Sequence, residues 1–215
     1  MPDQPDRNRR RLVAALGLLS LPASAALLPP TPRQSAGPFY PTELPLDDDN
    51  DLTWLGDRQQ RAAGEITDLS GRVLDTNGQP IAGARVEIWQ CDANGRYRHP
   101  RDPNRSALDP NFQGHGHSLT EADGGYRFRT IRPVPYPGRT PHIHIAIFPA
   151  KEQPFVTQLY VADEAGNELD FLYNRVPAEK RHLVTAAFSP AAAEGAEQQA
   201  SFDLILNRSD GTPQQ

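Results

Sequence analysis

The chain has 215 residues, 37% of them hydrophobic, and a formal net charge of −5 at pH 7. One domain with extended arms fits this length, and the acidic balance leaves no basic surface for binding a nucleic acid. Cys91 is the only cysteine, which excludes an internal disulfide and a cysteine-rich zinc site.

The first 25 residues have the composition of an export signal. Four arginines lie within residues 7–11, ahead of a ten-residue apolar run at 12–21, and Ala23-Ser24-Ala25 offers the small side chains of a cleavage site. The apolar run is too short to span a membrane, and RRRLV is similar to a twin-arginine signal. We expect a periplasmic or secreted protein without a membrane span; a basic disordered tail on a cytoplasmic protein is the alternative.

Residues 26–62 are rich in proline and in acidic side chains, a composition that predicts an extended N-terminal arm. The acidic run at 47–51 lacks the ligand spacing of an EF-hand loop and is interpreted as solvated. The main domain is expected over 63–208, followed by a disordered tail over 209–215.

Short runs of β-branched and aromatic residues, separated by Gly and Pro turn signals, predict about eight strands within the main domain. One short helix is expected within 163–176. The predicted fold class is all-β, a β-sandwich with long active-site loops. Strands are expected at 66–74, 84–90, 117–121, 125–131, 142–148, 155–161, 182–188 and 201–206.

His142 and His144 lie in HIHIAIF, where polar and β-branched residues alternate as in a strand. Side chains two residues apart point to the same face of a strand, so both imidazoles aim at one point while Ile143 and Ile145 face the other side. Two imidazoles placed in this way can bind a metal, although half-buried histidines without a metal follow the same pattern.

Tyr97 and Tyr136 precede these histidines, whereas the chain has no HExxH motif and no carboxylate close after His144. Phenolate oxygen is a hard, anionic ligand, and a trivalent iron lowers the pKa of a phenol well below its usual value of about 10. Two tyrosinates and one hydroxide would balance the charge of a ferric ion, which matters because an uncompensated charge is costly to bury.

Seven motifs follow one another between residues 30 and 206: QSAGPFYP (34–41), DLTWLGD (51–57), GRVLDTNGQPIAGARVEIWQCDANGRYRH (71–99), LDPNFQGHG (108–116), TEADGGYRFRTIRPVPYP (120–137), RTPHIH (139–144) and VTQLYV (156–161). In this order they resemble the intradiol ring-cleavage dioxygenases, most of all the protocatechuate 3,4-dioxygenase branch. The part GRVLDTNGQPIAGARVEIW alone would be unspecific, because many β-sandwich modules begin in this way.

The resemblance implies a non-haem Fe(III) cofactor, held by Tyr97, Tyr136, His142 and His144. It also implies that Tyr136 is catalytic, as the ligand that leaves the iron when a catecholate binds.

Further roles follow from the same resemblance. Arg139 is implied as a catalytic residue that stabilises negative charge on the substrate, and Gln158 as a catalytic residue that forms hydrogen bonds near the oxygen-binding region. The implied substrate-binding residues are Trp89 in the pocket wall and Pro38 and Phe39 in the arm.

Two further features bear on the predicted site: a second HxH pair that could compete as a ligand pair, and a departure from the family pattern after Tyr136. A second HxH pair, His115 and His117, has no neighbouring tyrosine and is interpreted as a pair of surface residues. Only Pro137 and Gly138 separate Tyr136 from the arginine that follows, whereas the two-chain protocatechuate enzymes have a longer insertion with an aromatic residue. The pocket wall should therefore be more open, which puts protocatechuate itself in doubt as the substrate.

The sequence thus predicts intradiol cleavage of a catechol-type ring by O2, which yields a cis,cis-muconate-type product. A small-molecule substrate and O2 are the expected partners, and a homo-oligomer whose arms close one another's sites is left open. The alternatives are a non-catalytic transthyretin-like β-sandwich binding module and a zinc or ferrous enzyme that uses the HxH pair. Colour separates the three, because only tyrosinate-to-ferric charge transfer makes a protein red-brown.

Overall fold

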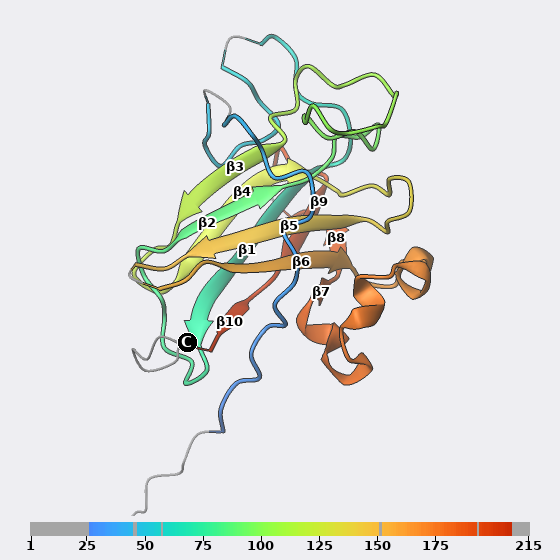
Figure 1. Cartoon of the computed structure of the whole chain (residues 1–215). Coiled ribbons are helices and arrows are strands. Elements are labelled where there is room, and N and C mark those ends of the chain that lie inside the picture. Colours follow the sequence, from blue (N-terminus) through green and yellow to red (C-terminus); the bar gives the residue numbers. More distant parts are fainter. Residues whose placement is uncertain (1–25, 45–46, 57, 151, 193, 208–215) are drawn as a thin grey trace, which may run out of the picture.

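The computed structural model describes residues 26–44, 47–56, 58–150, 152–192 and 194–207. The predicted export signal (1–25) and the predicted tail (209–215) lie outside these residues. Two five-stranded sheets pack face to face, and residues 26–44 run along them as an arm without helix or strand (Figure 1). No helix in the described segments is long and apolar enough to cross a bilayer.

The first sheet is organised around its longest strand, β1 (Ile66–Asp75). Strand β4 (Gly125–Ile131) pairs with β1 in antiparallel orientation, whereas β9 (Gln198–Ser201) and β10 (Leu204–Leu206) both pair with it in parallel orientation. Strand β8 (Phe188–Pro190) extends the sheet beyond β9.

The second sheet carries the residues of interest. Its order is β3-β2-β5-β6-β7, and every pairing is antiparallel except that of β6 with β7. The strands are β2 (Arg85–Trp89), β3 (His115–Leu119), β5 (His142–Phe148), β6 (Phe155–Val161) and β7 (Thr185–Ala186).

Three segments differ from the sequence-based prediction. The helix expected within 163–176 consists of two separate 3-10 turns, η1 (Ala165–Leu169) and η2 (Tyr173–Arg175). The strand expected at 182–188 is wrong in its first part, because η3 (Ala178–Leu183) extends into it. The strand expected at 201–206 is interrupted at Phe202, whose N–H donates to the carbonyl of Ser70 as the chain moves along β1.

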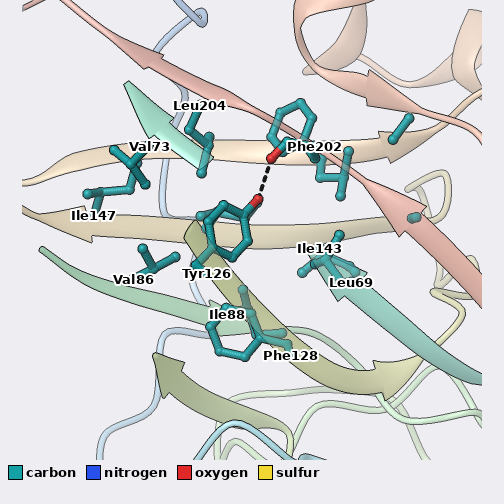
Figure 2. Close-up of a cluster of buried hydrophobic side chains, with 14 of the residues drawn as sticks. Leu69, Val73, Val86, Ile88, Tyr126, Phe128, Ile143, Ile147, Phe202 and Leu204 are labelled. Carbon is teal, nitrogen blue, oxygen red and sulfur yellow. Dashed lines mark hydrogen bonds between the residues drawn. The ribbon is translucent and has the colours of Figure 1, made fainter. Parts of the chain in front are cut away.

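Alternation along β5 separates the core from the outer face of the second sheet. Ile143, Ile145 and Ile147 are fully buried in the cluster between the sheets, together with residues of the first sheet such as Leu69 and Phe128 (Figure 2). The other residues of β5 point outward, so the packing of the isoleucines determines which way the histidines face.

Tyr126 joins β4 to the β9–β10 connection through a buried hydrogen bond. Its hydroxyl donates to the carbonyl of Phe202 at 2.5 Å (Figure 2), and burial raises the pKa of this tyrosine. Tyr126→Phe removes only this hydroxyl and leaves a buried carbonyl unpaired, so unfolding should become easier by about 1–3 kcal/mol. Thermal unfolding of both proteins measures this, and an unchanged melting temperature would contradict it.

Candidate active site

The outer face of the second sheet carries a row of polar and aromatic side chains. Register brings them together across three strands, because Trp89 of β2 lies opposite His144, and His144 lies opposite Gln158 of β6. His142 lies opposite Tyr160 in the same way. Pairing of strands β2, β5 and β6 is thus sufficient to assemble one wall of a site.

The two histidines of β5 face each other through their Nε2 atoms, 3.2 Å apart. The Nδ1 of His142 lies 2.7 Å from the carbonyl oxygen of Thr140, to which it donates, so its Nε2 carries the lone pair. Burial, with the nearby charge of Arg139, lowers the pKa of His142 to about 3 and holds that of His144 well below its usual value. Two neutral imidazoles therefore converge on one point, as a metal requires.

Tyr97 and Tyr136 complete the other side of this point. Their ring centroids are 5.3 Å apart, and Tyr97 lies 6.1 Å from the ring of His144 while Tyr136 lies 5.5 Å from that of His142. Burial raises the pKa of both tyrosines. The hydroxyl of Tyr97 is buried and has no hydrogen-bond partner within the described segments. No group in those segments therefore binds the lone pairs of this oxygen.

A tight turn makes Tyr136 and Arg139 neighbours. The N–H of Arg139 donates to the carbonyl of Tyr136 at 2.9 Å, and Gly138 between them has a φ of +83°. Proline at the second position and a positive φ at the third are the signature of a type II turn. The two-residue connection that departs from the family pattern is therefore a well-formed turn that presents a phenol and a guanidinium side by side.

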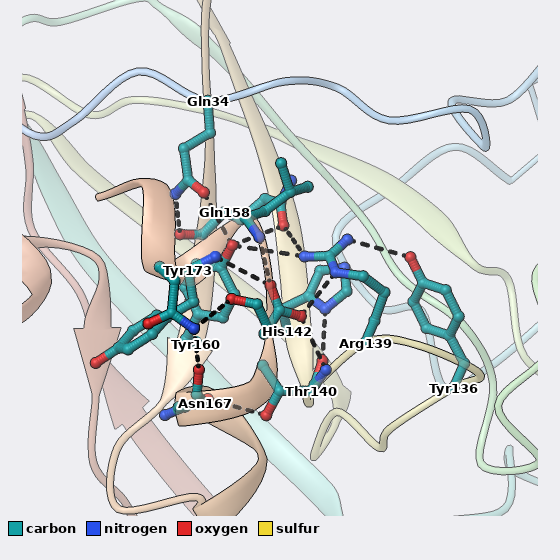
Figure 3. Close-up of polar contacts among 12 residues, drawn as sticks. Gln34, Tyr136, Arg139, Thr140, His142, Gln158, Tyr160, Asn167 and Tyr173 are labelled. Atoms are coloured by element: carbon teal, nitrogen blue, oxygen red, sulfur yellow. Dashed lines mark hydrogen bonds and ion pairs between the residues drawn. The ribbon is translucent and has the colours of Figure 1, made fainter. Parts of the chain in front are cut away.

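Arg139 connects the members of the site. Its Nη2 donates to Oε1 of Gln158 at 2.6 Å, and its Nη1 lies 3.3 Å from the hydroxyl of Tyr136 (Figure 3). Its Nε donates to Asp170 at 2.7 Å. Tyr160, which lies beside Gln158 on the outer face of β6, donates to Oε1 of Gln34 at 2.9 Å and thereby binds the arm.

The donor set suits a hard trivalent cation. Two phenol rings and two imidazole rings lie together, with the Nε2 atoms of the two histidines 3.2 Å apart, and phenolate oxygen with imidazole nitrogen is a donor set that can hold such a cation. Within the described segments there is no group of three His, Cys, Asp or Glu side chains that could hold a metal. A site formed by those four residue types alone, as expected of zinc or ferrous iron, therefore has no counterpart there.

Comparisons with known proteins agree with this geometry. The family model described as Dioxygenase matches residues 35–208, most of the chain. This chain belongs to the intradiol ring-cleavage dioxygenase family. The family and its protocatechuate 3,4-dioxygenase branch, expected from the sequence motifs, are thus confirmed.

Two curated relatives and one solved structure illustrate the relationship. The protocatechuate 3,4-dioxygenase beta chain of Burkholderia cepacia is 36% identical over 190 residues, which cover 84% of this chain and 81% of the relative. The hydroxyquinol 1,2-dioxygenase of Corynebacterium glutamicum is 30% identical over 151 residues, which cover 62% of this chain and 46% of that enzyme. This dioxygenase chain thus spans about half the length of the hydroxyquinol enzyme.

The fold comparison supports the predicted β-sandwich. The dioxygenase domain of a dioxygenase carbohydrate-binding protein fusion from Streptomyces sp. SirexAA-E superposes with a TM-score of 0.65 at 28% identity, and the match covers 84% of this chain and 100% of that domain. The all-β sandwich expected for this intradiol dioxygenase is confirmed.

The arm of this dioxygenase covers the site of its own chain. Phe39 packs on Tyr97 with ring centroids 4.8 Å apart, and the carbonyl of Pro38 accepts a hydrogen bond from Arg101. Gly37 lies so close to His144 that a Cβ atom on residue 37 would be 3.1 Å from Cε1 of the imidazole.

Trp89 lies behind His144. The two rings are stacked at 4.9 Å with an interplanar angle of 6°, and Tyr40 of the arm contacts the other side of the indole edge-on at 5.0 Å. The tryptophan is only 1% exposed, so its direct effect in this dioxygenase is to orient His144. Its role in substrate binding stays a prediction.

The interpretation of His115 as a surface residue is wrong. Its side chain is only 1% exposed, and its ring nitrogens lie 3.0 Å from Asp48 and 3.4 Å from Glu87. Burial alone would raise the pKa of Glu87, but hydrogen bonds from His115, Arg85 and Tyr40 lower it to about 2. This buried charged cluster fastens the arm to β2 and β3, a function that the HxH pattern does not reveal.

Proposed function

We propose that this chain is a non-haem Fe(III)-dependent dioxygenase that cleaves a catechol-type ring between its two hydroxyl-bearing carbons. O2 would be the second substrate, and the product would be of the cis,cis-muconate type. The observation that carries the proposal is the convergence of two phenols and two neutral imidazoles on one point of the outer face. Membership of the intradiol family supports it.

The four proposed iron ligands are Tyr97, Tyr136, His142 and His144. When bound, ferric iron would hold both catechol oxygens and make the ring reactive toward oxygen. The protein would contribute the tyrosinate of Tyr136, which can leave the site and take up a proton from the incoming catechol to become a neutral phenol.

Other side chains would support the reaction without touching the metal. Arg139 presents a fixed positive charge beside Tyr136, where negative charge develops on the substrate. Gln158 holds the guanidinium through its Oε1, and its Nε2 donates to the carbonyl of Ser35 in the arm at 3.0 Å. With Phe39 over Tyr97, the arm would exclude water from the reacting centre.

Metal analysis with a pair of histidine variants tests the proposal. Purified protein should contain about one iron per chain, ferric by electron paramagnetic resonance, and should be red-brown. The double change His142→Ala with His144→Ala should abolish iron binding and colour, because both nitrogen ligands are missing, whereas His117→Ala on β3, two strands away from β5, should keep both. Stoichiometric zinc with full activity, or a colourless and metal-free active protein, would overturn the proposal.

The substrate's ring substituents are best approached by a panel of substituted catechols, followed by oxygen uptake and product identification. Because the turn at Pro137 and Gly138 adds no aromatic wall, we propose that substituents on the ring are tolerated on that side. Export by the signal at 1–25 is a separate proposal, which N-terminal sequencing of the protein from its native host would test.

A further inference from the structure

Asp170 follows η1 directly, and its side chain is completely buried, with an exposure of 0%. Its Oδ2 accepts hydrogen bonds from Nε of Arg139 at 2.7 Å and from the N–H of Thr140 at 3.0 Å. Its Oδ1 accepts the N–H groups of Leu172 and Tyr173, each at 2.9 Å. Both oxygens are thus used within the protein.

This carboxylate holds two loops together. One oxygen faces the connection that carries the type II turn, and the other faces the start of η2. The hydroxyl of Thr140 adds a second link, since it donates to Oδ1 of Asn167 in η1 at 2.9 Å (Figure 3). The segment that contains η1 and η2 therefore supports the loop that carries Arg139 and Thr140, although none of its side chains is a proposed metal ligand.

The direction of the guanidinium follows from this contact. A guanidinium is planar, so a partner that holds Nε restricts where the two Nη atoms can point. With Nε on Asp170, Nη1 faces the hydroxyl of Tyr136 at 3.3 Å and Nη2 faces Gln158 at 2.6 Å. The arginine side chain is only 7% exposed, so water offers little alternative hydrogen bonding.

The same carboxylate is linked to a proposed metal ligand through the backbone of one residue, Thr140. Asp170 binds the N–H of Thr140, and the carbonyl of Thr140 accepts the hydrogen bond from Nδ1 of His142 at 2.7 Å. This carbonyl keeps the proton on Nδ1 and leaves Nε2 free.

We infer that Asp170 is a positioning residue for the reaction, which acts through Arg139 by fixing its guanidinium beside the departing Tyr136. The inference rests on the proposed function. It predicts that loss of the carboxylate affects the step in which charge develops more than it affects substrate binding.

Asp170→Asn gives the first measurement. The amide nitrogen would face two donors, Arg139 Nε–H and Thr140 N–H, so the guanidinium should turn away. We expect kcat to fall by about 10-fold to 10²-fold, as for small misplacements of a catalytic group, with KM and iron content nearly unchanged. Asp68→Asn is the matched control, because Asp68 binds Arg129 through both oxygens on the other sheet; it should leave kcat unchanged.

A double-mutant cycle separates positioning from simple support of the fold. If Asp170 acts through Arg139, Asp170→Asn should cause no further loss of kcat in the Arg139→Leu background. It should also lower the melting temperature by less in the Arg139→Leu background than in the wild type, with or without iron, because the ion pair that it breaks is already absent there. Equal losses in both backgrounds, or an unchanged kcat in the single variant, would overturn the inference.

Two arrangements keep the test decisive. Should Asp170→Asn alone fail to fold, the comparison of Arg139→Leu with the double variant still applies: a double variant whose kcat is lower than that of Arg139→Leu counts against the inference. Absence of catechol cleavage by the wild type would refute the proposed function instead, and the melting-temperature cycle on iron-free protein would still measure the coupling of the two residues.

Discussion

Arg139→Leu should lower kcat by about 10²–10³-fold, the range seen when one electrostatic stabiliser is removed from a preorganised site. The guanidinium touches Tyr136, Gln158 and Asp170 but none of the proposed nitrogen ligands. Because all four proposed ligands, Tyr136 included, are still present in this variant, iron content and the visible spectrum should remain close to those of the wild type. Steady-state kinetics together with metal analysis and a spectrum checks both parts.

The same change should also destabilise the fold. Removal of one partner from a buried ion pair usually costs about 3–5 kcal/mol, and the three backbone N–H bonds to Asp170 place this case at the lower end. Kinetics should be measured well below the lowered melting temperature. Arg139→Lys is the companion variant: it keeps the charge but not the planar fork, so it should be nearly as slow. Full activity of the lysine variant would mean that charge alone suffices.

Tyr136→Phe should separate metal binding from turnover. Three ligands remain in Tyr97, His142 and His144, so iron should stay bound, while loss of one of two tyrosinate donors should shift the visible band. Turnover should fall by roughly 10²-fold, because no phenolate is left to accept a proton as the catechol binds. Absorption spectra and rates on the same preparation measure both effects.

Tyr160→Phe is the matched control for this variant. It removes a phenol of the same outer face that lies beside Gln158 and is not a proposed ligand. The visible band should then stay in place while the arm is held less firmly. If Tyr136→Phe retained the wild-type spectrum, Tyr136 would not be a ligand, and the tight turn after it would have moved the site.

Much of the second sheet could be predicted from alternation alone. His142 and His144 alternate with isoleucines that have to be buried, so the sequence determines both the strand and the face on which the imidazoles lie. The same argument predicts the position of Tyr160, because a residue two positions from Gln158 on a strand lies on the same face. The register of β2 against β5 places Trp89 beside His144. The β-sandwich prediction did not specify this register.

Other parts carried no local signal. Asp170 lies 31 residues after Arg139, and only the folded chain shows that a lone aspartate between two 3-10 turns reaches the guanidinium. His115 resembled a surface residue because its partners, Asp48 and Glu87, come from the arm and from another strand. The first part of the strand expected at 182–188 was wrong because apolar residues such as Leu183 also occur in 3-10 turns, where periodicity of two is absent.

Strand β5 is buried on both faces, with core isoleucines on one side and the proposed ligands on the other. Its two histidines are buried, and this burial lowers the pKa of both and favours their neutral forms. Any cation bound there recognises the native chain and not the unfolded one, so its binding free energy adds to the stability of the sheet. Metal binding and unfolding are therefore linked equilibria. When metal is scarce, the protein should unfold more readily, so its lifetime shortens together with its rate of turnover.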